Sequence, residues 1–130
     1  MTLPPKGEIY DPDGLAVPIV IAEEDLPADL NELPKRALAE AGIEETADAY
    51  VDVWERFCKV LFHRAQRVFE RTSDVDGLRL LFGSLDDPDR GTPAYLYELV
   101  LHRHPEVQTE VVRDVVIGYS MIVLMLREGF

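Results

Sequence analysis

Cysteine is almost absent: Cys58 is the only one among 130 residues. A single thiol excludes an internal disulfide and favours a reducing compartment, so the sequence predicts a cytoplasmic protein. The opening residues contain no apolar core flanked by basic side chains, which argues against a secretion signal. The longest uncharged apolar run, the twelve residues 115–126, is shorter than the about 20 residues of a membrane span.

Positive charge is also scarce, because 13 lysine and arginine residues stand against 25 acidic ones, a formal net charge of −12. This balance argues against direct binding of nucleic acid or of an anionic membrane, since both attract basic proteins. It fits a binder of basic protein surfaces, a mimic of a polyanion, or adaptation to a salt-rich cytoplasm. The net charge alone does not distinguish among these three interpretations.

Motifs that would fix a reaction are missing. There is no glycine-rich phosphate loop, and residues 118–122 lack the second glycine of a nucleophile elbow. Cys58 falls on an apolar helical stripe, where cysteine behaves as a small hydrophobic residue. The sequence therefore predicts a protein that is not an enzyme and that binds no cofactor.

One group of side chains resembles a metal site in composition: His102 and His104 with Glu98 and Glu106. Glu98 and His102 share a helical face, but His104 falls at a helix break and no second pair completes a set of ligands. The acidic loop 86–89 lacks the glycine that a calcium-binding EF-hand loop requires. We predict no bound metal, and a metal-dependent enzyme is the weakest alternative.

The strongest structural signal is a helix over 46–71. Its apolar residues recur every three or four positions without a proline or glycine, which is the period of one helical face. At 1.5 Å per residue this helix is about 40 Å long, so the remaining elements are expected to pack along it. The repeating residues are Ala47, Val51, Trp54, Cys58, Leu61, Ala65 and Val68, widened by Tyr50, Phe57, Phe62 and Phe69.

Shorter helices are predicted from their end signals. Pro34 and Gly42 bound a helix over 34–41, Thr92 and Pro93 start one over 93–103, and a brief amphipathic turn follows Ser73 or Asp74. Pro105 opens the last helix, which extends to about residue 128. The predicted fold is a mainly α, small helical bundle with two long antiparallel helices, 46–71 and 105–128. The helical domain covers 34–130.

Residues 1–33 form an extended or hairpin N-terminal arm in this interpretation, because six prolines exclude a long helix. Residues 10–14 have turn chemistry, and 15–22 is the best strand candidate in the chain. Pro18 restricts that strand to an edge, and a lone strand is not stable in water. We therefore expect it to pair with residues 8–10, to lie on the helices, or to add to a partner's sheet.

The last helix is apolar nearly all round after Val115, more than a small domain can cover. Its β-branched residues also leave a strand open as an alternative, with Gly118 as a bend. Together with the arm, this excess predicts a surface for self-association or for a protein partner. The residues assigned to this interface are Ile19, Ile21, Ile117, Met121, Leu124 and Met125.

A basic stripe lies opposite the apolar face of the long helix. Residues 1–55 carry a charge of −11, whereas 56–71 carry five bases and one acid. This charged face either holds an acidic group or is a solvated surface with i, i+4 ion pairs such as Asp52 with Arg56. Its members are Arg56, Lys59, Arg67 and Arg71, with His63 between them.

Two functional hypotheses follow. The first is a non-enzymatic protein-interaction or assembly module, a subunit of a homo-oligomer or of a larger complex. The second is an acidic stoichiometric inhibitor, of the phage anti-defence or immunity-protein type, that occupies a basic site on a target protein.

Overall fold

The computed structural model describes residues 4–10 and 16–129, and it is mainly helical. Two short strands pair as an antiparallel hairpin, with Ile9 opposite Pro18 and Tyr10 opposite Val17. Within the described residues, the elements in chain order are β1 (Ile9–Tyr10), β2 (Val17–Pro18), η1 (Glu23–Asp25), η2 (Leu30–Glu32), α1 (Leu33–Ala41), α2 (Ala47–Arg71), α3 (Val75–Gly83), η3 (Ser84–Asp86), α4 (Pro93–Arg103), η4 (Pro105–Val107) and α5 (Gln108–Glu128).

The predicted end signals act as expected. The hydroxyl of Thr46 accepts a hydrogen bond from the backbone N–H of Ala49 at 3.1 Å and so caps α2. Thr92 caps α4 in the same way, and Gly42 ends α1 with the left-handed φ of 72° that glycine tolerates. The last segment is a helix preceded by one 3₁₀ turn, so the strand alternative for it is wrong.

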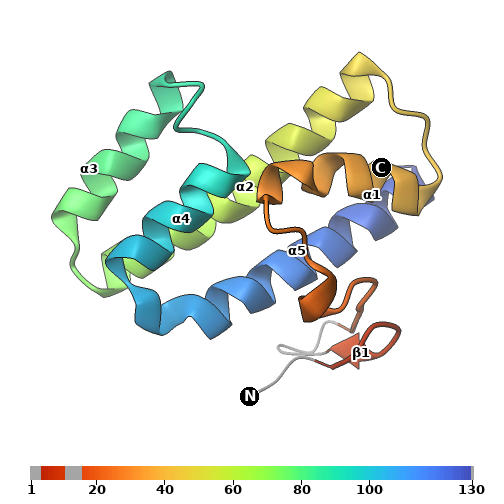
Figure 1. Cartoon of the computed structure of the whole chain (residues 1–130), viewed down its shortest axis with the longest axis horizontal. Helices are drawn as coiled ribbons and strands as arrows, with labels where there is room; N and C mark the ends of the chain where they lie inside the picture. The colour runs from red at the N-terminus through yellow and green to blue at the C-terminus, as the bar shows by residue number, and fades with distance from the viewer. Residues whose placement is uncertain (1–3, 11–15, 130) are drawn as a thin grey trace.

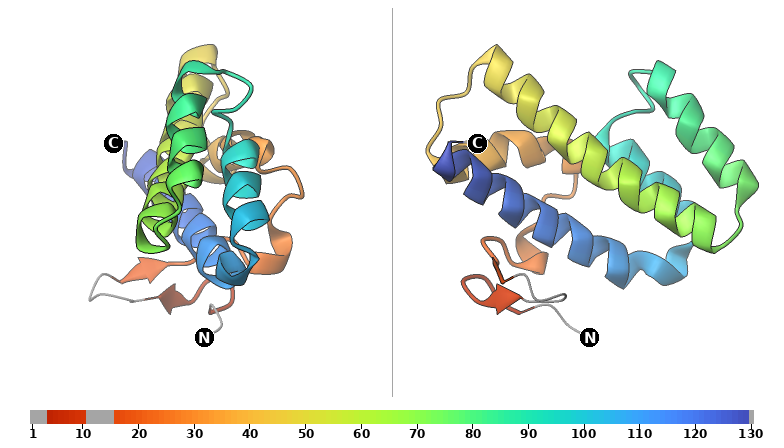
Figure 2. Two further views of the ribbon diagram at one scale, coloured as in Figure 1. Left: turned by 90° about the vertical axis from the view of Figure 1, so that its left-hand side faces the viewer. Right: turned by 180° about the vertical axis from the view of Figure 1, so that it is seen from behind.

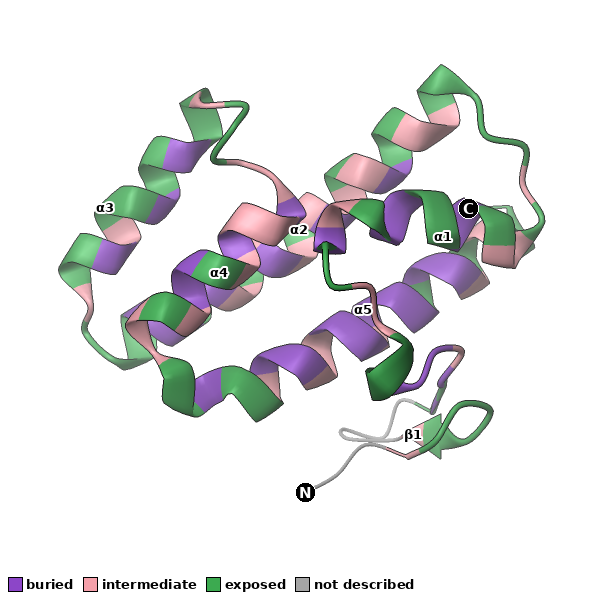
Figure 3. Cartoon of the chain, in the orientation of Figure 1, coloured by how far each residue is buried: buried purple, intermediate pink, exposed green. Residues whose placement is uncertain are grey.

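The core forms where α1, α4 and α5 pack on α2, with α1 also in contact with α5 (Figure 1). Phe57 of α2 and Tyr119 of α5 lie in it with ring centroids 6.1 Å apart, and Phe69 is fully buried. α3 lies at the edge of the molecule, and most of its residues are exposed (Figure 3). In the view from behind, α2 and α5 lie side by side over most of their lengths (Figure 2).

The N-terminal arm lies against α5. The backbone N–H of Val20 donates to the hydroxyl of Ser120 at 3.1 Å, and Ser120 in turn donates to the carbonyl of Val116 at 2.9 Å. Glu8 and Ile19 continue the hairpin through one backbone hydrogen bond of 2.8 Å. Of the alternatives for the arm, the structure therefore combines the hairpin with packing on the helices. Most of the turn predicted at 10–14, and Leu15 of the strand candidate, lie outside the described residues.

Two sequence assignments within α2 need correction. The predicted stripe included Ala47 and Val51, but both are exposed, and the buried face instead begins at Val53 and continues through Phe57 and Leu61. The shift occurs because the first turns of α2 direct Ala49 and Tyr50 towards the core, so Ala47 and Val51 point away from it. Trp54 is consequently half-buried and is not part of the core.

Candidate functional site

An apolar groove of about 880 Å³ lies between the middle of α2, the segment 84–91 and the start of α4. Its walls combine aromatic, aliphatic and thiol side chains, the usual composition of a ligand pocket. Leu85 stands at its mouth with 66% of its surface exposed. The apolar lining residues are Trp54, Cys58, Val60, Phe62, Leu85, Pro88 and Leu96.

The outer wall of this groove is a short segment that holds its own shape. The carbonyl of Asp87 accepts hydrogen bonds from the N–H groups of Arg90 and Gly91, and its carboxylate pairs with Arg90 at 3.3 Å. A side chain at Gly91 would come within 3.1 Å of the Ser84 carbonyl, which explains the glycine there. The segment is therefore an ordered wall, and the charge of Asp87 is already paired.

The polar groups that α2 contributes gather along one rim of the groove, whereas Ser84 and Asp87 come from the segment 84–91. Lys59, His63 and Gln66 line this rim from α2. Lys59 and His63 are one helical turn apart, so both can reach one group placed at the rim. They belong to 56–71, the segment with a net positive charge in an otherwise acidic chain. The groove thus has an apolar body and a basic edge.

Cys58 belongs to the apolar wall. Burial, followed by the negative charge of Glu55, raises the pKa of its thiol to about 11. The thiol is therefore protonated at neutral pH and is a poor nucleophile. This agrees with its predicted behaviour as a small hydrophobic residue.

The second surface feature is an apolar stripe along α5. Met121 and Met125 are 46% and 36% exposed, although their neighbours Ile122 and Val123 belong to the core. The guanidinium of Arg56 lies 4.0 Å from the sulfur of Met125 at the edge of this stripe. We define the α5 stripe as Met121 and Met125 with the partly covered Ile117 and Leu124.

The other predicted interface residues require a correction. Ile19 and Ile21 are only 1% and 2% exposed, and both belong to the core of the chain itself. The arm is extended there, so alternate residues point to one side, and that side faces α5. These two side chains therefore contact the chain's own helices and are not on the surface.

The basic stripe of α2 does not form one surface. Arg56 donates to Asp52 at 3.0 Å, the i, i+4 pair predicted for a solvated helix face. Arg71 forms two hydrogen bonds, of 2.9 and 3.0 Å, with Glu110 of α5. Lys59 and Arg67 are exposed, and Lys59 lines the groove.

Ion pairs between α2 and α5 account for much of that basic segment. Arg64 contacts Glu110 at 2.7 Å and also pairs with Asp114. Hydrogen bonds from Arg71, together with the charge of Arg64, lower the pKa of Glu110. Burial raises the pKa of Asp114 despite its arginine partner. These side chains hold the two helices together, which is a structural role.

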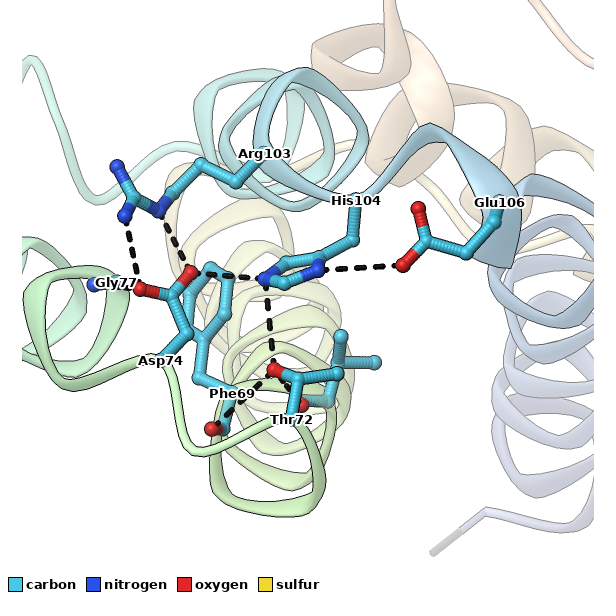
Figure 4. Close-up of polar contacts among 8 residues, drawn as sticks. Phe69, Thr72, Asp74, Gly77, Arg103, His104 and Glu106 are labelled. Atoms are coloured by element: carbon cyan, nitrogen blue, oxygen red, sulfur yellow. Dashed lines mark hydrogen bonds and ion pairs between the residues drawn. The ribbon is translucent and has the colours of Figure 1, made fainter.

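The predicted histidine–carboxylate cluster forms differently from a metal site (Figure 4). His104 places Nε2 2.8 Å from Asp74 and Nδ1 3.3 Å from Glu106. Arg103 donates two hydrogen bonds, of 2.7 and 2.8 Å, to the same Asp74 carboxylate. His102, by contrast, is exposed, although it lines the same pocket as Asp74 and His104.

Asp74 is the centre of this network, and it also caps α3 by accepting from the N–H of Gly77 at 2.9 Å. Hydrogen bonds from Arg103, followed by those from Gly77 and His104, hold its pKa well below the usual range. The network joins the turn after α2 to the end of α4. Ser73 occupies that turn with a φ of 55°, a conformation that a non-glycine residue rarely adopts.

The network around Asp74 is not arranged for acid–base catalysis or for binding a metal ion. His104 Nε2 lies 3.4 Å from the Thr72 hydroxyl, but it is closer to Asp74, at 2.8 Å. The hydroxyl donates instead to the carbonyl of Val68 at 2.8 Å, so the histidine is not placed as its general base. In the part of the chain that the structure describes, no three His, Cys, Asp or Glu side chains are arranged to hold a metal ion. The arrangement ties helices together.

For the residues that line the groove, sequence reasoning favoured a position in the core over a ligand pocket. It placed Trp54, Cys58 and Phe62 in the core because their spacing is that of a buried face. The structure instead lines a groove with them, and its opposite wall is the segment 84–91, which follows the edge-to-face contact of Phe62 with Phe82, 5.8 Å between centroids. The only usable signal was the excess width of the aromatic face.

None of the helices in residues 4–10 and 16–129 combines the length and apolar composition that crossing a bilayer requires. Comparison with known proteins gives no further constraint. The chain matches none of the protein families, the curated proteins or the solved structures with which it was compared.

Proposed function

We propose that this chain is a non-enzymatic protein-interaction or assembly module that uses the α5 stripe as its contact surface. The observation that supports this is the exposure of Met121 and Met125 on a helix whose opposite face is buried. Methionine is unbranched and polarizable, so it adapts to a partner surface better than other apolar residues. The α5 stripe consists of apolar side chains without a nucleophile, which favours binding over catalysis.

In its simplest form, the proposal is that two copies of the chain associate through the α5 stripe. The α5 stripe lies on one face of one helix, so two copies can bring the same surface together about a twofold axis. The protein would then be a subunit of a homo-oligomer, or would offer the stripe to a different protein in a larger complex. A cytoplasmic location, as the single cysteine predicts, belongs to the same proposal.

The architecture favours such a role. We propose that the fold is a small bundle built on two long antiparallel helices, α2 and α5. In support, Arg71 contacts Glu110 near one end of the pair, whereas Arg56 lies near Met125 at the other. Two ion-paired helices of this length provide a rigid base for a surface that meets a partner.

Light scattering after size-exclusion chromatography tests the proposal at micromolar concentration. We expect a mass above that of one chain, which falls to one chain in the double variant M121E/M125E. The matched control V75E, at an exposed apolar position on α3, should keep the oligomer. A wild-type chain that remains a monomer and captures no partner through the stripe would contradict the proposal.

A second candidate function rests on the acidic surface. Five exposed acids surround the α1–α2 connection and the first turns of α2, a dense patch at one end of the molecule: Glu44, Glu45, Asp48, Asp52 and Glu55. We propose as the alternative that this patch occupies a basic site on a target protein, as a stoichiometric inhibitor would. Association with a target captured from the native host should then slow steeply with added salt. Binding that is indifferent to ionic strength would contradict it.

A further inference from the structure

We propose that the groove between α2 and the segment 84–91 binds a single-chain anionic amphiphile, such as a fatty carboxylate. Its apolar tail would lie along Trp54, Phe62 and Leu85, and its head group would meet Lys59 and His63 at the rim. This site is separate from the α5 stripe and does not depend on the proposed interaction function.

The dimensions of the groove agree with a small ligand. Its volume of about 880 Å³ lies within the roughly 300–1,000 Å³ typical of small-molecule sites. Its walls come from residues far apart in the sequence, with Cys58 on α2 facing the same space as Pro88 and Leu96. Apolar surface on three sides can remove a hydrocarbon chain from water, which is the main source of affinity for such ligands.

The side chains at the rim determine that the head group of the ligand is negatively charged. The rim carries Lys59 and His63, whereas the carboxylate of Asp87 on the opposite wall pairs with Arg90 and accepts from the N–H of Asp89. The polar groups of α2 are on one side only, which matches a ligand with one polar end. A peptide or an apolar ring without a charged end would leave this rim unused.

The chain supplies its own reporter. Trp54 is the only tryptophan and Cys58 the only cysteine, and both line this groove. A ligand there should change the tryptophan emission and protect the thiol from a small thiol-specific reagent. Both signals come from the site without any added label.

The experiment titrates the full chain with dodecanoate below its micelle concentration and follows Trp54 fluorescence. Dodecanol and dodecyltrimethylammonium, with the same tail, are the comparison probes. We expect saturable binding that is about tenfold tighter for dodecanoate than for the cation. Since the chain carries a formal charge of −12, unspecific adsorption would favour the cation, so preference for the anion identifies the site.

Variants locate the binding. K59E should weaken dodecanoate about threefold to tenfold and leave dodecanol unchanged, whereas E55Q, which removes a nearby negative charge, should strengthen dodecanoate about twofold. L85D should abolish binding of both probes, and the matched control L80D, at an exposed leucine of α3 outside the groove, should bind normally. Circular dichroism verifies that each variant is folded.

Three results would overturn the proposal: no saturable signal, equal or tighter binding of the cation, or normal dodecanoate binding by L85D. The M121E/M125E variant should bind dodecanoate like the wild type. The outcome here is therefore independent of the test of the α5 stripe.

Discussion

Two isoleucines of the arm and two methionines of the last helix are all large apolar residues, yet only the isoleucines are covered. Ile19 and Ile21 of the arm lie in the core, whereas Met121 and Met125 of α5 remain exposed. The two regions are in contact, since the arm packs on α5 through Val20 and Ser120. Part of the apolar excess of α5 is therefore covered by the arm itself.

The difference follows from the side-chain periods of an extended segment and of a helix. An extended segment presents every second residue to one side, so the buried residues Val17, Ile19 and Ile21 all face the helices. A helix presents its residues all round, and α5 has neighbours on most sides but not along the α5 stripe. The proposed partner surface therefore lies on one narrow face of α5, and Ile19 and Ile21 of the arm are not part of it.

The largest expected effect tests whether the arm is an integral part of the core. I19A should lower the free energy of unfolding by about 3 kcal/mol, because it deletes a buried side chain and leaves a cavity. Urea denaturation measures this loss. The control I9A, at an exposed position of the same hairpin, should cost less than about 1 kcal/mol. Equal small losses for both variants would mean that the arm is only loosely attached.

The next prediction concerns Asp74, which belongs neither to the arm nor to the α5 stripe. D74A should lower the free energy of unfolding by about 2 kcal/mol, because it removes the cap of α3 and the acceptor shared by Arg103 and His104. D74N keeps a capping oxygen and should lose about half as much. Urea denaturation of both variants at about pH 7 measures the difference.

The same variant carries a pH prediction. The depressed pKa of Asp74 means that its stabilising contribution is complete above the unfolded value of about 3.9 and is lost as the pH falls towards the folded value. The stability gap between wild type and D74A should therefore narrow from about pH 7 to about pH 3. A gap that widens on acidification would contradict this assignment.

A smaller effect tests the contact between the two compared regions. S120A leaves the N–H of Val20 without its acceptor and should cost about 1 kcal/mol. Amide hydrogen exchange should show faster exchange at Val20 and little change in α2. The control T109A, at an exposed position of the same helix, should stay within about 0.5 kcal/mol of the wild type.

The smallest expected effect on stability is at the α5 stripe. M121A and M125A should each change the free energy of unfolding by less than about 1 kcal/mol, because both side chains are partly in water already. Thermal unfolding at low protein concentration measures this without a contribution from self-association. A loss as large as that of I19A would show that the stripe is covered within a single chain, and the comparison would fail.

Helices were predictable wherever a local signal marks their ends. Thr46, Thr92 and Gly42 act through their immediate neighbours, so the sequence is sufficient for them. The burial of Ile19 was not predictable, because it depends on a helix about 100 residues further along the chain. The groove was hidden for the same reason: the period of Trp54 and Cys58 indicates an apolar face but not which element lies over it.

The hydrogen bond from Val20 to Ser120 has a consequence for biosynthesis. Its two ends are 100 residues apart, so the arm leaves the ribosome long before the helix on which it rests has been translated. Until then Ile19 and Ile21 have no surface to pack on, and docking of the arm must await completion of α5. Closing so large a loop is expected to be among the slower events of folding.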